Sequence, residues 1–198
     1  MWLRTDEEQE AVEALRLASR MAEECAENDA AWRWVIIALH QAVQGFMVLS
    51  LRHGNGLLAL SPDSFKAWME AHDNGGPYPR GEKLDTYLGL YKKVKSKDLG
   101  TLGGNRRFEP RGSEGRGIRM LSKLRNEFIH FSPKGWSLEL DGLPQICLDA
   151  LRIVEFLGWE TENIFWHEPS LRSSAQEEST RLKKFLQHLK RQYASGKS

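Results

Sequence analysis

Residues 32–51 have the sequence WRWVIIALHQAVQGFMVLSL, the most hydrophobic stretch in a chain of 198 residues. Its apolar side chains recur three and four positions apart, which is the spacing of one face of an α-helix. Arg33, His40, Gln41 and Gln44 interrupt the stretch, so it contains no apolar run long enough to cross a bilayer. We therefore expect a buried helix at the centre of a soluble core, and no contact with a membrane.

Helical spacing of apolar residues continues on both sides of this stretch. Thr5 and Glu8 form a capping-box pattern that predicts a helix over 6–27. Ser61 followed by Pro62 predicts the start of a short helix that ends before Asp73. Further helices are predicted from near Glu82, over 117–131 with Pro133 closing it, from a cap at Asp141 past Trp159 towards Phe165, and over 175–194.

Six or seven helices with almost no strand pattern predict an all-α protein. Only residues 136–140 alternate in a way that permits a short extended segment. Short connections between most helices favour antiparallel neighbours. The expected organisation is one helical domain over 1–172, followed at 173–198 by a basic helix or tail that either packs on the domain or frays.

Charge is sorted along the chain, although the net charge is only +1. Residues 92–125 hold eleven basic and three acidic side chains, whereas residues 1–30 hold three basic and nine acidic ones. Residues 181–198 hold six basic side chains and no acidic one. Blocks of this kind attract polyanions or an acidic partner surface, although a solvated tail explains the C-terminal block equally well. Between 96 and 117, six glycines and four arginines without helical periodicity predict a long, mobile basic loop.

Several functional classes find no support in the sequence. Cys25 and Cys147 are the only cysteines, and both occupy apolar helical positions, which is typical of reduced thiols in the core of a cytoplasmic protein. The N-terminal residues lack a basic segment followed by an apolar one, so we expect no signal peptide. The histidines lack ligand spacing, and residues 100–104 lack the lysine of a phosphate-binding loop. We expect no metal ion and no cofactor.

The helix predicted over 117–131 carries the most unusual polar residues of the chain. Arg125 falls in the middle of an apolar face formed by Ile118, Leu121, Phe128 and Ile129. A guanidinium in such a position is costly to desolvate unless an anionic group meets it. Asn126 and His130 lie four residues apart on an adjoining face, where the amide can orient the imidazole.

The segment Arg125-Asn-Glu-Phe-Ile-His130 resembles the motif of the HEPN superfamily, in which an arginine is followed by four to six residues and a histidine, with a polar residue directly after the arginine. The surrounding residues 124–136 are also similar to a group of plasmid- and chromosome-borne bacterial HEPN proteins. The resemblance implies an up-and-down helical bundle that forms a homodimer, so that two such motifs face one cleft.

The resemblance also implies a metal-independent endoribonuclease of the toxin or phage-defence type. His130 would then transfer protons at the ribose 2′-hydroxyl and the leaving oxygen, Arg125 would stabilise charge on the phosphate, and Asn126 would support the geometry. The second subunit would supply the second histidine. Basic residues would hold the RNA backbone through salt-sensitive contacts; these are Lys92, Lys93, Lys95, Arg106, Arg107, Arg111, Arg116 and Arg119.

Other interpretations of the same residues remain open. The chain could be a non-catalytic HEPN module that binds RNA, a nucleotide or a partner protein, or an unrelated helical protein. Arg125 could pair with a core carboxylate while His130 caps its helix. His40, Gln41 and Gln44 could line the cleft or be satisfied polar groups of the core. Trp136 could stack on a base or close the end of the core.

Regulation of the site is predicted only in part. Some HEPN proteins carry a tyrosine two residues after the motif histidine, which a partner nucleotidyltransferase modifies. Ser132 occupies that position here, so we do not expect this modification. A separate antitoxin protein remains open as a partner.

Overall fold

The computed structural model describes residues 1–52, 56–97, 99, 106–130 and 135–196. Within these ranges the secondary structure is helical, apart from an isolated bridge between Leu60 and Leu84, and the predicted all-α class is confirmed. The seven α-helices of the described residues are α1 (Glu7–Glu24), α2 (Trp32–Leu51), α3 (Pro62–Asp73), α4 (Tyr87–Val94), α5 (Glu114–Ile129), α6 (Leu143–Glu155) and α7 (Pro169–Ala194).

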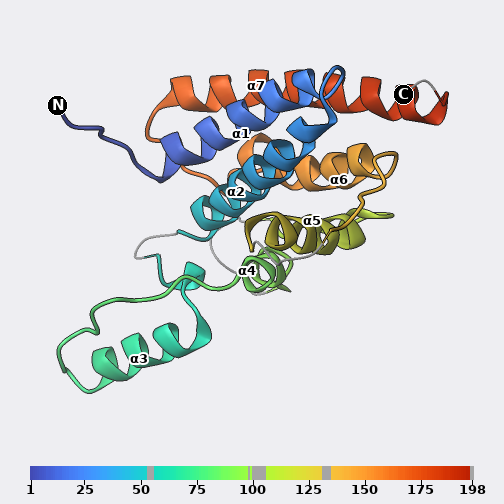
Figure 1. Cartoon of the computed structure of the whole chain (residues 1–198). Coiled ribbons are helices and arrows are strands. Elements are labelled where there is room, and N and C mark those ends of the chain that lie inside the picture. The colour runs from blue at the N-terminus through green and yellow to red at the C-terminus, as the bar shows by residue number, and fades with distance from the viewer. Residues whose placement is uncertain (53–55, 98, 100–105, 131–134, 197–198) are drawn as a thin grey trace.

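Helix α2 lies at the centre of the bundle, as its hydrophobic sequence predicts. It packs against α1, α4, α5 and α6, and α7 covers α1 and α6 from the other side (Figure 1). By length and composition alone, residues Asp29–Leu51 could span a membrane, but 67% of that apolar window is buried inside the bundle. Burial of this extent is what the core helix of a helical domain requires.

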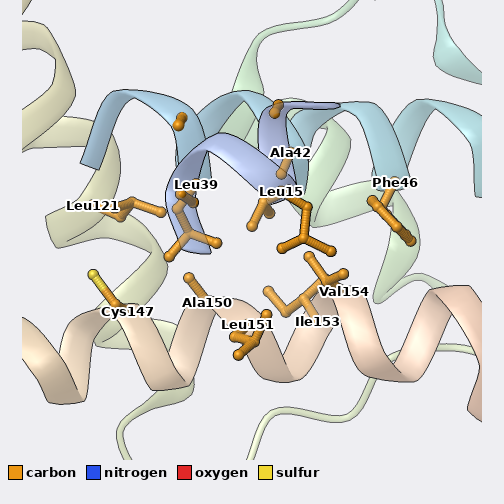
Figure 2. Packing of buried hydrophobic residues seen from close by; sticks show 14 of the residues in the cluster. Leu15, Leu39, Ala42, Phe46, Leu121, Cys147, Ala150, Leu151, Ile153 and Val154 are labelled. Carbon is orange, nitrogen blue, oxygen red and sulfur yellow. The ribbon is translucent and has the colours of Figure 1, made fainter. Parts of the chain in front are cut away.

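The core is one cluster of side chains between these helices. Figure 2 shows Leu15 of α1, Leu39 of α2, Leu121 of α5 and Val154 of α6 gathered between the four helices. Cys147 lies in the same layer, and both cysteines are free thiols in the core, as predicted. Apolar burial on this scale is the main stabilising contribution to the fold.

Helix α7 is part of the bundle. Its apolar face, Ala175, Leu182, Leu186 and Leu189, is buried in the same core as α2. The helix begins at Pro169, so the boundary predicted at 173 falls inside it, and packing is observed where fraying was the alternative. Part of its positive charge meets carboxylates of the chain itself, because Arg181 binds Glu23 and Lys183 binds Glu155.

Helix α3 stands apart from the bundle (Figure 1). It starts at Ser61 and Pro62 as predicted, with the Ser61 hydroxyl accepting the Ser64 N–H, and it ends at Asp73. None of its residues is buried, and Phe65 is 38% exposed. Trp68 stacks on Tyr78 with the ring centroids 4.7 Å apart, so the aromatic groups of this arm mainly contact one another.

The structure also corrects the starts of four other predicted helices. Asp6 caps α1 by accepting the Gln9 N–H, whereas the predicted cap, Thr5, binds Glu10. Helix α4 begins at Tyr87 instead of near Glu82, because Leu84 pairs with Leu60 in an extended bridge. The other two differences concern α5, which begins at Glu114 instead of 117, and α6, whose cap position is Gly142 instead of Asp141.

Two further predictions lie on the connections. Residues 136–140 form no strand, because no extended partner lies beside them in the described chain. The helix after Pro144 does continue past Trp159, as a π-helical turn over Phe156–Glu160 that ends before Thr161. Pro133, the predicted terminator of α5, lies outside the described residues.

Candidate functional site

The second half of α5 carries the motif, and the packing of its first half sets the orientation. Gly117, Ile118, Leu121 and Leu124 are the buried face, and this face packs against α6 and α2. The Cβ of a residue larger than glycine at 117 would lie 2.5 Å from the Asp149 Cβ, so α5 and α6 approach closely there. Close packing at this end fixes the direction in which the last two turns project.

Arg125 lies at the edge of the buried face of α5. It is half-buried, Leu124 is buried beside it, and Ile129 is 37% exposed, so the predicted position at the centre of an apolar stripe is wrong by part of a turn. Its Nη1 donates to Asn126 Oδ1 over 3.0 Å. Among the described residues, no carboxylate forms an ion pair with Arg125, so the core salt bridge considered for it is not found.

Asn126 and His130 are both exposed. The Asn126 amide oxygen binds Arg125, so the predicted amide contact with the His130 ring is not formed; a guanidinium is the stronger, charge-assisted donor. The His130 N–H still donates to the Asn126 carbonyl, and with ψ of 91° the chain leaves the helix at His130. The exposed His130 therefore lies at the C-terminal end of α5.

His40 of α2 is buried in the core, close enough to the motif for the charge of Arg125 to act on it. Its side chain is 4% exposed and stacks on Tyr87, with ring centroids 3.8 Å apart. Burial, and then the charge of Arg125, lower the pKa of His40 to about 4. It is therefore a neutral core histidine within electrostatic range of Arg125, while Gln41 is exposed and Gln44 only half-buried.

A cavity of about 220 Å³ opens beside the last turn of α5. Phe128 and Trp136 form one wall, with ring centroids 5.0 Å apart, and Trp136 is 42% exposed. The Arg33 guanidinium lies 5.7 Å from the centre of the Phe128 ring. Trp136 thus packs on the end of the core and still presents an aromatic surface to solvent.

The basic residues predicted to hold RNA separate into distinct groups. Lys93 is engaged within the chain, because it binds Asp85 over 2.8 Å and also donates to a backbone carbonyl. Lys95 lies over the Tyr91 ring, 4.3 Å from its centre, and Arg119 acts on the same phenol electrostatically. These two cations gather between α4 and α5.

Arg106, Arg107 and Arg111 line a separate cavity, and Lys92 and Arg116 are exposed. Within the described chain, none of the eight predicted RNA-binding residues forms a hydrogen bond or ion pair with the motif on α5. Three of the eight line this cavity, and the other five do not.

The basic segment predicted as a mobile loop over 96–117 is held at several of its described residues. The Phe108 N–H donates to the Val94 carbonyl over 2.8 Å, and the Phe108 ring is buried. Residues from 114 onward belong to α5, where the Glu114 carboxylate accepts the Arg111 N–H at the positive end of the helix. Residue 98 and residues 100–105 lie outside the described residues.

Comparisons with protein-family models, curated proteins and solved structures found no match for this chain. Among the described residues, no three His, Cys, Asp or Glu side chains gather into a group that could hold a metal ion.

Proposed function

We propose that this protein is a metal-independent endoribonuclease of the HEPN toxin or phage-defence type, acting in the cytoplasm as a homodimer through Arg125, Asn126 and His130. The observation that carries the proposal is the state of Arg125. The residue is half-buried, and the bond of its guanidinium within the described chain goes to a neutral amide. A guanidinium that no carboxylate neutralises gains stability when an anion binds, and a phosphate diester is such an anion.

The reaction is an internal transesterification. The ribose 2′-oxygen forms a bond to the adjacent phosphorus, the bond from phosphorus to the 5′-oxygen breaks, and a 2′,3′-cyclic phosphate remains. One His130 accepts the 2′-hydroxyl proton, and His130 of the second subunit donates a proton to the leaving oxygen. Arg125 stabilises the charge that develops on the phosphate oxygens, and Asn126 holds the guanidinium in place.

Two features beside the motif suit an RNA substrate and a second subunit. The exposed Trp136 ring offers a surface on which a base can stack, next to the cationic Arg33. Ile129 exposes apolar surface at the C-terminal end of α5. Contact with a second copy would remove this surface from water and bring two His130 rings to one cleft.

Cleavage of RNA in the presence of a chelator tests the proposal. Purified protein should release fragments that end in a 2′,3′-cyclic phosphate, and His130→Ala and Arg125→Ala should each reduce the rate by at least about a hundredfold. His188→Ala is the matched control, because His188 is exposed on α7 far along the chain from the motif. Equal rates for the parent and the two motif variants would contradict the assignment.

The mass in solution tests the composite site separately. Light scattering should give about twice the mass of one 22.7 kDa chain for the parent and for both motif variants. A monomer that cleaves RNA would remove the shared-cleft mechanism but keep the residues. A dimer that binds RNA without cutting it would favour the non-catalytic binding module.

A further inference from the structure

A second cavity, about 830 Å³ in volume, lies away from the motif residues. It opens between the segment that follows residue 105 and the C-terminal end of α6, and neither Arg125, Asn126 nor His130 lines it. Five of its lining side chains are basic, and these are Lys97, Arg106, Arg107, Arg111 and Arg152. Three are acidic, so the walls carry an excess of two positive charges.

The floor of this cavity is rigid. Phe108 and Phe156 pack edge to face with ring centroids 5.3 Å apart, and both rings are buried. The guanidinium groups of Arg106 and Arg152 lie 5.7 Å and 5.9 Å from the centre of the Phe156 ring. Two cations are thus held against one aromatic ring, although they come from segments far apart in the sequence.

A buried amide fixes the position of Arg106. The Asn163 side chain is 1% exposed, accepts the Arg106 N–H over 2.9 Å and donates to the Arg106 carbonyl over 2.6 Å. The Arg106 guanidinium also donates to the Glu160 carbonyl over 3.1 Å. Because one buried side chain binds both the N–H and the carbonyl of Arg106, the fold determines where Arg106 lies.

The acidic residues of the walls neutralise only part of the positive charge of this cavity. Glu160 accepts two bonds of 2.8 Å from Arg152, and Glu109 binds Arg107. The Glu114 carboxylate binds the backbone N–H of Arg111, which leaves the Arg111 guanidinium without a carboxylate partner among the described residues. All these carboxylates are on partly exposed side chains that can move aside when a stronger anion enters.

We propose that this cavity binds the phosphate groups of a nucleotide. Guanidinium groups bind phosphate oxygens in pairs, and a phosphate carries more charge and more acceptors than the carboxylates that it would displace. The volume is within the range of small-ligand sites and exceeds what inorganic phosphate needs, so a nucleoside can follow its phosphates in, with its base against a guanidinium plane. The proposal does not depend on RNA cleavage at His130.

The bound phosphate groups belong either to a free nucleotide or to the 5′-phosphorylated end of an RNA. Calorimetric titrations with ATP, ADP, AMP, adenosine and inorganic phosphate measure the binding of free nucleotides. We expect affinity to rise with the number of phosphates, adenosine not to bind, and phosphate alone to bind more weakly than AMP. Equal binding of ATP and adenosine, or no heat from any nucleotide at millimolar concentration, would overturn the proposal.

Variants locate the site. Arg111→Gln removes a guanidinium that has no described side-chain bond, so the fold should be kept, and ATP should bind roughly tenfold more weakly or worse. Arg152→Gln should weaken ATP at least as much. Arg80→Gln makes the same change of charge at an exposed position outside the cavity and should bind ATP like the parent. Equal losses in all three variants would indicate diffuse attraction and reject the cavity.

The His130→Ala variant separates this inference from the proposed nuclease. It should bind ATP like the parent whether or not the parent cuts RNA. In the same variant, displacement of labelled ATP by a short RNA with a 5′-phosphate, but not by one with a 5′-hydroxyl, would assign the site to RNA ends. Failure of both RNAs to displace ATP would assign it to free nucleotides.

Discussion

Folding buries the imidazole of His40 almost completely. In the folded chain its pKa is about 4, against a usual value of 6.5, because the ring is buried and, to a lesser extent, because the charge of Arg125 acts on it. The unfolded chain therefore binds a proton to His40 before the folded chain does as the pH falls. Stability due to the neutral ring is fully present above about pH 6.5 and is lost as the pH decreases towards 4.

Urea unfolding across this pH window tests the imidazole directly. Between pH 7 and pH 4, the free energy of unfolding of the parent should fall by on the order of 2–3 kcal/mol more than that of His40→Gln, which cannot be protonated there. His188→Gln, at an exposed position, should follow the parent. Parallel pH curves for the parent and His40→Gln would show that burial of His40 does not contribute.

The sequence predicts that residues of the candidate site lie together only where these residues belong to one helix. Arg125, Asn126 and His130 lie within two turns of α5, so their spacing alone predicts a common location. Their bonding was not predictable, because the choice of Asn126 between Arg125 and His130 depends on rotamers. His40 joins them through packing of α2 on α5, and Arg106 meets Arg152 only in the folded chain; neither contact has a local sequence signal.

At the scale of elements, apolar periodicity predicted the existence of the helices better than their ends. The ends depend on contacts that a local pattern does not contain. Leu84 fits the apolar face of α4, but its backbone pairs with Leu60 and delays the helix to Tyr87. Glu114 begins α5 early by binding the Arg111 N–H. Propensity is a weak preference that such tertiary contacts readily override.

The start of α1 gives a matched test of sequence against structure. The sequence favours Thr5 as the cap, whereas the structure has the Asp6 carboxylate accepting the Gln9 N–H over 2.9 Å. Asp6→Ala should lower the free energy of unfolding by about 1 kcal/mol, because one N–H of the first turn loses its acceptor. Thr5→Ala should change it by less than about 0.5 kcal/mol. If thermal or urea unfolding showed a larger loss of stability for Thr5→Ala than for Asp6→Ala, Thr5 would be the cap, as the sequence predicts.

Close approach of α1 and α2 depends on one missing side chain. A Cβ at Gly45 would lie 2.7 Å from the Ala11 Cβ and 3.2 Å from its Cα, so the two helices cannot accept one without moving apart. Gly45→Ala should therefore destabilise by about 1–3 kcal/mol, in spite of the better helix propensity of alanine.

Gly115→Ala is the control for this change. The nearest atom to a Cβ there is the Tyr91 hydroxyl at 3.7 Å, an ordinary contact, so this variant should be neutral or slightly stabilising. Chemical denaturation of the two variants distinguishes steric conflict from propensity. A Gly45→Ala protein as stable as the parent would show that the helices can shift without loss.

At the scale of the whole molecule, the segregated charge of the sequence is partly neutralised within the chain. The acidic N-terminal block supplies Glu23 to Arg181, and α6 supplies Glu155 to Lys183. The exposed pair of Arg181 and Glu23 contributes little stability itself. Both pairs do orient α7, whose apolar face then closes the core, and Trp32 Nε1 donates to the Tyr193 hydroxyl over 2.9 Å near its end. The C-terminal block is thus largely a structural part of the bundle.

Truncation decides whether α7 is an appendage or part of the domain. A chain that ends at residue 172 loses three leucines that are buried completely or almost completely, Leu182, Leu186 and Leu189. At roughly 1.5–3 kcal/mol for each buried leucine, this loss is comparable to the whole stability of a typical domain. We expect residues 1–172 to lack a cooperative thermal transition and to expose apolar surface to a dye. A chain that ends at residue 194 should melt within about 2 °C of the parent, because the core contacts of α7 are kept. A cooperative melt of residues 1–172 near the parent temperature would show instead that the bundle is complete without its last helix.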